Sequence, residues 1–451
     1  MSLSLDLARR VAALDPATFD PEAVRWARNA IADMIGCTLL GAPTDTTGTV
    51  LMPDLYGPGP CLVLGRGERL GMLDAAFVNG TAGHALDYDD TSKSLSGHPT
   101  VIIIPGLLAL AESRGASGRA LTDAYIVGVE AATRFARGVN FQHYEKGWHP
   151  TATLGIFGAA VAASALMGLD EARTAHAISI AASLASGLKA NFGTETKPMH
   201  AGLAARNGLF AALLAEKGVT GAPTALEHPQ GFLEVFNGAG AYDAGRMLEG
   251  WGAPLDLLSP GISIKKYPCV YSVHGAIDAA IALQADALPE TAGVTDVLVR
   301  MHPRRLLPHV RNPATSALNA KFSLPYAVAR ALVNGAVLLE HFDDAALGDP
   351  EVTRVMGLIR MEPHEDDAND YGAEVAVTLA SGEVRRQAVQ APLGRGPETP
   401  LPQQMLEAKF LDCARASLTE EGAARVFALL MGLDRLPQAA DLTAAIEAAT
   451  R

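Results

Sequence analysis

The chain has 451 residues, 49% of them hydrophobic and 19% charged, which is enough apolar surface for a large core and two domains. Its net charge of −13 argues against nucleic acid or an anionic membrane surface as the main partner. The cysteines Cys37, Cys61, Cys269 and Cys413 are far apart, so we expect no disulfide framework, zinc site or iron–sulfur cluster. The amphipathic N-terminal segment lacks a signal-peptide core, and we expect a cytoplasmic protein.

Helical periodicity dominates the chain from residue 4 to about 260. The clearest predicted helices cover residues 21–41, 74–87, 118–138 and 171–190, and glycine or proline stands at most of their ends. Residues 152–169 are long and apolar enough for a membrane span. Because alanine and glycine dominate this stretch, we expect a closely packed core helix instead.

Near residue 263 the pattern becomes mixed. Helices are predicted at 273–287 and 321–336, and strands at 295–302, 373–380 and 383–390, the last two joined as a hairpin by Ser381 and Gly382. From about residue 402 the pattern is helical again. The predicted fold is therefore mainly α, with a large all-α domain (residues 1–262 and 401–451) and a smaller inserted α+β lid domain (residues 263–400).

Basic residues directly precede prolines that open apolar runs. The pairs are His98-Pro99, His149-Pro150 and Lys197-Pro198, and a looser case has Lys265 and Lys266 before Pro268. Proline is favoured at the first position of a helix, so each pair places a basic side chain at a helix N-terminus, where free N–H groups favour anions. Histidine exchanges protons near neutral pH, and lysine supplies fixed charge. Such a pocket suits a small carboxylate whose protons are to be moved.

An acidic loop precedes His98. A helix is predicted to end near Leu86, and Asp87, Asp89, Asp90 and Thr91 follow it. Three interpretations remain open for this loop. It is a solvated helix end with Thr91 as a cap, or a metal site built from His84, Asp87, Asp90 and His98, or a loop whose Asp87 or Asp90 orients a catalytic histidine or lysine. We favour the last and predict no metal site, because no metal-specific spacing such as HExxH is present.

Four segments together resemble the MmgE/PrpD family: NGTAGHALDYDDT with GHPT, GWHPTATLGIFGAAVAA, TETKPMHAGLAARNGLFAALLAEKGVTG with HPQGF, and KKYPCVYSVHGAID. The resemblance covers residues 5–445. The family contains 2-methylcitrate dehydratases, cis-aconitate decarboxylases and iminodisuccinate epimerases. It implies a helical domain with an α+β lid, a homodimer, and an active site between the domains that uses neither metal nor organic cofactor.

The resemblance also implies the site residues. Expected catalytic residues are His98, His149, Lys197 and Tyr326, and expected substrate-binding residues are Lys265, Asp87, Asp90, Tyr144 and His200. Of the two histidines we favour His149 as the proton-transfer base, because Tyr144 and Trp148 beside it would shape and dry the pocket.

The resemblance implies carbon-acid chemistry on a small di- or tricarboxylic acid. Our main expectation is a cofactor-independent, dehydratase-like lyase that removes a proton next to a carboxylate. An epimerase of an iminodisuccinate-like acid, a decarboxylase of an aconitate-like acid and a non-catalytic carboxylate-binding protein remain alternatives. Val101 and Ile102 argue against methylcitrate as substrate, and Val270 argues against decarboxylation, because family members with those activities carry other residues there.

Overall fold

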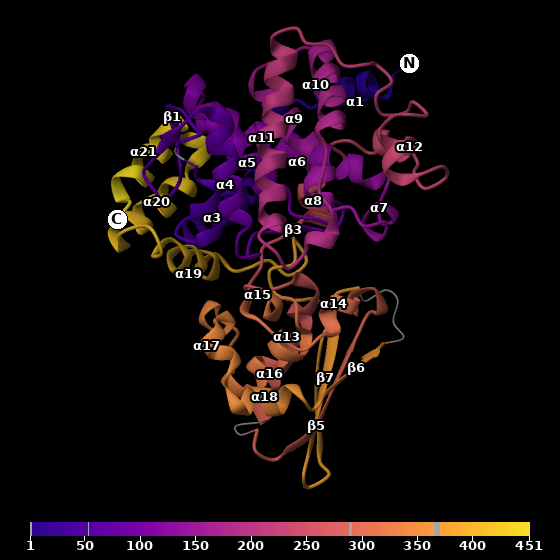
Figure 1. The fold of residues 1–451 in the computed structure, drawn as a ribbon, viewed down its shortest axis with the longest axis vertical. Coiled ribbons are helices and arrows are strands. Elements are labelled where there is room, and N and C mark those ends of the chain that lie inside the picture. Colours follow the sequence, from indigo (N-terminus) through magenta and orange to yellow (C-terminus); the bar gives the residue numbers. More distant parts are fainter. Residues whose placement is uncertain (1, 53, 288–290, 365–369) are drawn as a thin grey trace. The chain divides into compact units, whose positions relative to one another are not determined.

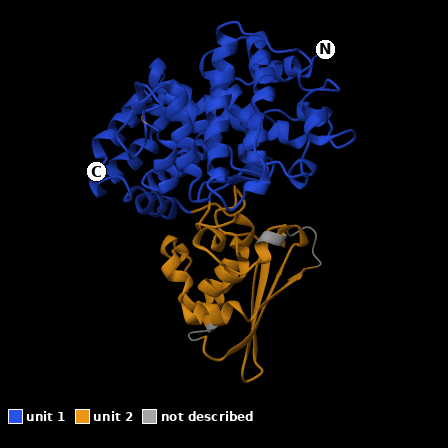
Figure 2. Ribbon diagram, in the orientation of Figure 1, with its two compact units in different colours: residues 1–264, 402–451 blue, residues 265–401 orange. Residues whose placement is uncertain are grey.

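The computed structural model describes residues 2–52, 54–287, 291–364 and 370–451 and divides into two compact units (Figure 2). Unit 1 comprises residues 1–264 and 402–451, and unit 2 comprises residues 265–401. Unit 2 is therefore an insertion in the sequence of unit 1. The expectation of separately folding domains divided after residues 262 and 400, one of them a lid, stays a prediction.

The helices of unit 1 begin at local capping signals. α2 (Pro21–Gly41) follows Asp20, whose side chain accepts a hydrogen bond from the Glu22 N–H, and α10 (Glu171–Leu184) follows Asp170 in the same way. α6 (Gly118–Arg137) is capped by Ser117. The further α-helices of this unit are α1 (Leu3–Ala12), α3 (Asp45–Val50), α4 (Met72–His84), α5 (Pro99–Arg114), α7 (Gln142–Glu145), α8 (Pro150–Thr153), α9 (Gly155–Leu166), α11 (Thr196–Glu216), α12 (Phe232–Asn237), α19 (Gln403–Ala414), α20 (Glu420–Leu430) and α21 (Ala440–Ala449).

Small residues let the central helices of unit 1 approach closely. α4, α5, α9 and α11 pack against one another (Figure 1). A Cβ atom added at Gly202 of α11 would lie 2.3 Å from the carbonyl oxygen of Phe77 in α4, so only glycine fits at this crossing. The close contact holds the C-terminal end of α4 beside the N-terminal end of α11, where Lys197 stands.

The expectation of a core helix at residues 152–169 is confirmed for its central part. α9 is buried along Gly155–Ser164, and the preceding residues form the separate short helix α8. None of the described helices combines the length and the apolarity that a membrane crossing requires.

The C-terminal helices return to the N-terminal part of unit 1. α19 packs on α2, and α20 packs on α21. Lys409 of α19 is buried and lies 2.6 Å (Nζ to Oδ1) from the buried Asp33 of α2. Its ammonium also donates a 2.9 Å hydrogen bond to the backbone oxygen of Tyr88, just beyond α4. One side chain of α19 thus connects three segments that are far apart in sequence.

Unit 2 contains a four-stranded sheet in the order β6-β5-β7-β8, with helices packed on it. β5 (Val294–Met301) pairs parallel with β6 (Ile359–Pro363) and antiparallel with β7 (Ala373–Leu379), which forms the predicted hairpin with β8 (Val384–Val389). Val297, Val299, Val375 and Val377 are fully buried in the core. The α-helices of this unit are α13 (His274–Ala287), α14 (Pro308–Arg311), α15 (Ala317–Ala320), α16 (Leu324–Asn334), α17 (Asp344–Leu347) and α18 (Pro350–Met356).

The predicted fold class, mainly α, is confirmed, with three corrections. The expected all-α part contains two short antiparallel pairs, β1 (Pro58–Leu62) with β2 (Arg69–Leu70) and β3 (Thr91–Ser92) with β4 (Ile262–Ser263). β2, β3 and β4 have two residues each, too few to show an alternation of polar and apolar residues, and the two prolines and the glycine of β1 (Pro58–Leu62) are typical of a turn, so the sequence did not reveal these strands. The helix predicted at 171–190 ends at Leu184, and strand β6 was not predicted.

Candidate active site

The expected site residues of unit 1 lie at the ends of four helices. His84 is the last residue of α4, and residues 85–98, which we call the site loop, lead from it to α5. His98 is the residue before the first turn of α5, and His149 holds the same position before α8. Lys197 lies in the first turn of α11. The helix-start positions that the basic–proline pairs predict are therefore confirmed for these three residues. The looser case was wrong, because Lys265, Lys266 and Pro268 lie in a segment without helix and the next helical turn begins only at Tyr271.

The site loop is held by contacts from distant segments. Lys409 binds the Tyr88 carbonyl, and Thr91 pairs with Ser263 in the β3–β4 ladder. A Cβ atom added at Gly97 would lie 2.7 Å from the backbone nitrogen of Thr151, so glycine allows the starts of α5 and α8 to touch. These contacts bring the two His-Pro helix starts together.

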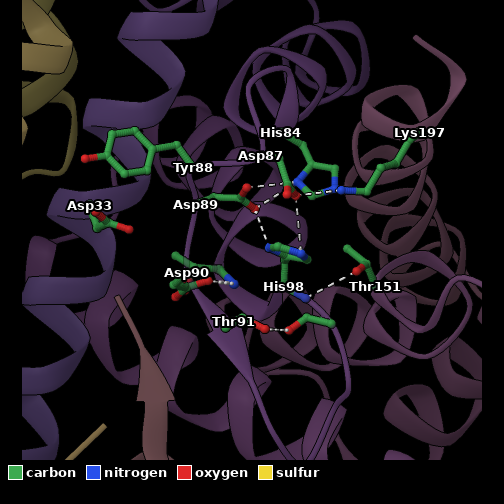
Figure 3. Close-up of polar contacts among 12 residues, drawn as sticks. Asp33, His84, Asp87, Tyr88, Asp89, Asp90, Thr91, His98, Thr151 and Lys197 are labelled. Atoms are coloured by element: carbon green, nitrogen blue, oxygen red, sulfur yellow. Dashed lines mark hydrogen bonds and ion pairs between the residues drawn. The ribbon is translucent and has the colours of Figure 1, made fainter. Parts of the chain in front are cut away.

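A connected set of polar contacts occupies the centre of the site (Figure 3). Lys197 Nζ lies 2.6 Å from Asp87 Oδ1, and His98 Nε2 lies 3.8 Å from the same oxygen. Asp89 Oδ2 lies 3.2 Å from His98 Nδ1. Both carboxylate oxygens of Asp89 lie 3.0 Å from His84 Nδ1. Carboxylates, imidazoles and one ammonium therefore alternate through a buried region.

A second group of rings adjoins this set. The imidazole of His149 lies 5.9 Å from that of His84 between ring centroids, in a stacked arrangement. His149 Nδ1 lies 3.2 Å from His200 Nδ1. The ring of Phe192 covers His149 edge-on at 4.9 Å, and Lys197 Nζ lies 5.4 Å from the centre of the same phenyl ring. The apolar ring excludes water from one side of the two basic groups.

Burial controls the charge states of the histidines. It lowers the pKa of His84 to about 4, against the opposing effect of Asp89. Burial, together with His84 and Lys197, holds the pKa of His149 well below its usual range. Burial and Lys197 also lower the pKa of His200. At neutral pH these three imidazoles are therefore uncharged, and each has one nitrogen lone pair.

The carboxyl groups of the site loop differ in charge. Burial alone would raise the pKa of Asp89, but the adjacent His84 and His98 outweigh it and hold the pKa well below its usual range. Burial raises the pKa of Asp90 well above its usual range, although hydrogen bonds from Thr100 oppose this. Asp89 is thus a carboxylate at neutral pH, whereas burial disfavours the charged form of Asp90.

Four side chains have donor atoms that could surround a cation. His84, Asp87, Asp89 and His98 each offer one ligand atom, all within 4.8 Å of one another. Nitrogen and oxygen donors of this kind suit a transition metal. However, the ammonium of Lys197 already contacts Asp87, and a second positive charge beside it would be repelled. The arrangement fits an anionic ligand better, and the expectation of no metal stays a prediction.

The structure brings together five of the nine expected residues: Asp87, His98, His149, Lys197 and His200. Asp90 instead accepts hydrogen bonds from the backbone and hydroxyl of Thr100, whose hydroxyl also lies 2.6 Å from Tyr125 Oη. Tyr144 lies against Lys189, whose ammonium is 3.4 Å from the ring centre.

The remaining two expected residues belong to unit 2. Lys265 is buried there. The Tyr326 hydroxyl donates to the backbone oxygen of His341 and accepts from Arg330 Nε at 3.0 Å, within the core of that unit. Their functional roles, like those of Asp90 and Tyr144, stay predictions.

Sequence reasoning did not select Asp89, although it contacts two histidines of the site. The acidic run Asp87–Asp90 offered several carboxylates, and nothing local distinguished them.

Comparison with known proteins identifies the family. Residues 5–244 match the model of the MmgE/PrpD N-terminal domain, and residues 267–433 match that of the C-terminal domain. The chain belongs to the MmgE/PrpD family. It is 30% identical over 442 residues to the cis-aconitate decarboxylase of Homo sapiens, covering 93% of this chain and 89% of the relative. It is 29% identical over 439 residues to that of Aspergillus terreus, covering 91% and 89%.

These matches confirm the resemblance inferred from the four sequence segments. This MmgE/PrpD chain is an enzyme of the lyase type, as its relatives are. Both family domains are present in one chain, and the match to the relatives extends over most of their length.

Proposed function

We propose that this MmgE/PrpD enzyme decarboxylates a small tricarboxylic acid of the cis-aconitate type without a metal or organic cofactor. The observation that carries the proposal is the buried grouping of the Lys197 ammonium with the imidazoles of His98 and His149. The names of the relatives support the same reaction. They raise the decarboxylase from an alternative to the leading proposal, ahead of the dehydratase that the sequence favoured.

The chemistry needs an anion site and a proton donor. When a carboxylate leaves as CO2, the C–C bond electrons move through the neighbouring double bond toward the carbon beside another carboxylate. That carbon must then receive a proton, and the negative charge must be stabilised until it does. A fixed cation and helix N-termini stabilise such charge in a site from which water is excluded.

We assign one role to each central residue. Lys197 binds a substrate carboxylate in exchange for its contact with Asp87. His98, whose side chain is 13% exposed and whose Nε2 lies on the Asp87 and Lys197 side, delivers the proton to carbon. His149 is neutral and adjoins His200, so it supplies a hydrogen bond to the substrate rather than a charge. This assignment prefers His98 to His149 for proton transfer, because His98 has a carboxylate beside its other nitrogen.

The test is product formation in deuterated buffer. Purified protein would be incubated with cis-aconitate, and CO2 release and deuterium position in the product would be followed by NMR. We expect CO2 loss with one deuterium on the former vinylic CH carbon, which becomes a methylene next to a terminal carboxylate of the dicarboxylic product. Citrate-like, methylcitrate-like and aspartate-derived acids would be tested in parallel. Water loss from a hydroxy acid, or exchange of deuterium with no CO2 release from any acid, would replace the proposal by a dehydratase or an epimerase.

We further propose a homodimer that acts in the cytoplasm, as expected from the sequence. Light scattering coupled to size exclusion tests the first statement, and a mass near twice that of the chain is the expected result. Localisation of a tagged chain in intact cells tests the second.

A further inference from the structure

Asp89 is the most deeply enclosed carboxylate of the site. Its side chain is 0% exposed, and the side chain of His84 is equally inaccessible. Burial of a carboxylate costs several kcal/mol unless it is well paired. Asp89 has imidazole partners on both sides, since His84 Nδ1 lies 3.0 Å from its oxygens and His98 Nδ1 lies 3.2 Å from Oδ2. The three side chains form a row, His84–Asp89–His98, in which the middle member is the acceptor.

The row fixes which nitrogen of each ring has the hydrogen. A carboxylate only accepts, so a neutral imidazole that contacts it places its N–H on the contacting nitrogen. For His84 this nitrogen is Nδ1, and the low pKa of about 4 keeps that ring neutral. For His98 the contacting nitrogen is also Nδ1, which leaves Nε2 toward Asp87, 3.8 Å away. Nε2 is therefore the nitrogen that can exchange a proton with a ligand.

We propose that Asp89 is the positioning residue for His98. It accepts a hydrogen bond from the Nδ1–H, orients the ring, and stabilises the imidazolium when Nε2 has a proton to deliver. His84 donates from its Nδ1–H to Asp89 and so fixes the carboxylate in place. Asp89 does not contact the reacting atoms itself and acts through His98. In this structure the His98 Nδ1–H does not point straight at the oxygen, although the distance is that of a hydrogen bond. Such contacts commonly tighten when the substrate binds.

The local backbone supports an orienting role over a merely structural one. His98 ends the site loop in an extended conformation before Pro99, and its side chain caps no helix N–H. Its backbone N–H is bound by Thr151 Oγ1 at 3.2 Å, which fixes the position of the residue but not the rotation of its ring. Within the described chain, Asp89 is the carboxylate closest to His98 Nδ1, so it is the group that can set this rotation.

The first experiment is a double-mutant cycle on cis-aconitate turnover. The kinetic arm rests on the proposed function, with His98 as proton donor. Asp89→Asn is expected to lower kcat by roughly 10²–10⁴-fold with KM changed only a few-fold, because an amide can donate to Nδ1 and so move the ring proton to Nε2. In a His98→Asn background, Asp89→Asn is expected to lower kcat by less than about 3-fold, because the imidazole through which Asp89 acts is absent. Equal losses in both backgrounds would overturn the proposal.

A matched control separates positioning from stability. Glu112 is a buried carboxylate (7% exposed side chain) of the same unit that accepts hydrogen bonds from Leu62, Arg69 and Thr443, away from the site. Glu112→Gln is expected to lower the unfolding midpoint without lowering kcat. If it lowers kcat as much as Asp89→Asn does, the kinetic effect of Asp89 is only structural.

A second measurement needs neither turnover nor a variant of Asp89. In protein labelled with ¹⁵N-histidine, the ring nitrogens of His98 would be assigned by comparison with His98→Gln. In its neutral form, wild-type His98 is expected to show a protonated Nδ1 and an unprotonated Nε2. The reverse pattern would overturn the proposal even if the Asp89 variants did not fold. If the wild-type protein decarboxylates none of the acids, the proposed function fails, and the NMR result still decides the role of Asp89.

Discussion

The buried ion pair between Lys409 and Asp33 offers a test of what holds the site loop. Its atoms are 2.6 Å apart, and the side chains are 6% and 0% exposed. Burial would lower the pKa of Lys409, but Asp33 beside it outweighs burial and raises that pKa above its usual range. Lys409→Met retains most of the packing volume and removes the charge, so Asp33 would lose its ion-pair partner inside the protein.

Lys409→Met is expected to lower the free energy of unfolding because the buried charge of Asp33 is no longer balanced by an opposite charge. Removing one member of a buried ion pair typically costs about 3–5 kcal/mol, because the remaining charge stays desolvated. The Tyr88 carbonyl also loses its 2.9 Å hydrogen bond from Lys409, worth about 1.5–3 kcal/mol for a charged donor. We therefore expect Lys409→Met to lower the free energy of unfolding of unit 1 by about 4–8 kcal/mol. We also expect it to lower kcat, because Tyr88 lies between Asp87 and Asp89.

Tryptophan fluorescence during urea unfolding is the appropriate assay. Trp26, Trp148 and Trp251 all lie in unit 1, so the signal reports that unit rather than the whole chain. The control is Arg119→Met, which removes an exposed ion pair with Asp123 of nearly equal length, 2.7 Å. An exposed pair contributes at most about 1 kcal/mol, so the control should shift the midpoint little.

A double variant gives the result that would refute the reasoning. In Lys409→Met with Asp33→Asn, no uncompensated charge remains, and we expect recovery of about 2 kcal/mol relative to Lys409→Met alone. If the double variant is instead less stable than Lys409→Met, or if Lys409→Met costs no more than Arg119→Met, the pair is not the stabilising element that its burial implies.

Three further predictions concern charge, pH and metal. Lys197→Met should lower kcat/KM by about 30- to 1,000-fold, equivalent to about 2–4 kcal/mol of transition-state stabilisation, because a desolvated substrate carboxylate loses its cation; wild-type kinetics would exclude that contact. Burial lowers the pKa of His143 to about 4, and its ring nitrogens contact Asn237 and Thr153 at 2.7 Å. Its neutral form stabilises the fold fully above pH 6.5 and progressively less toward pH 4. The wild-type protein should therefore lose up to about 3 kcal/mol of its free energy of unfolding over that range through this group, and His143→Gln should lack this pH-dependent loss. Exhaustive chelation should leave turnover unchanged, and rescue of a chelated, inactive enzyme by one metal would revive a site at His84, Asp87, Asp89 and His98.

Local signals in the sequence determined much of the fold. Caps and helical periodicity predicted α2, α6, α13 and the helical C-terminus, and the alternating strands around Ser381 and Gly382 predicted the β7–β8 hairpin. The basic–proline pairs placed His98, His149 and Lys197 at helix starts, because proline is best tolerated in the first turn of a helix: Pro99 and Pro150 are the first residues of their helices, and Pro198 is the third of α11. These features depend on neighbours in the chain, so the chain order alone specifies them.

Tertiary structure alone decided which side chains meet. Asp89 rather than Asp90 faces His98, because the path of the site loop turns at Asp87, whose φ of 54° is left-handed, and Lys409 and the β3–β4 pair then fix the loop. Those partners come from residues more than 150 positions away in the sequence, and two-residue strands and a single buried lysine leave no periodic pattern. The sequence by itself supplied the charges and the helix ends, and long-range packing chose which carboxylate stands beside the proton-transfer histidine.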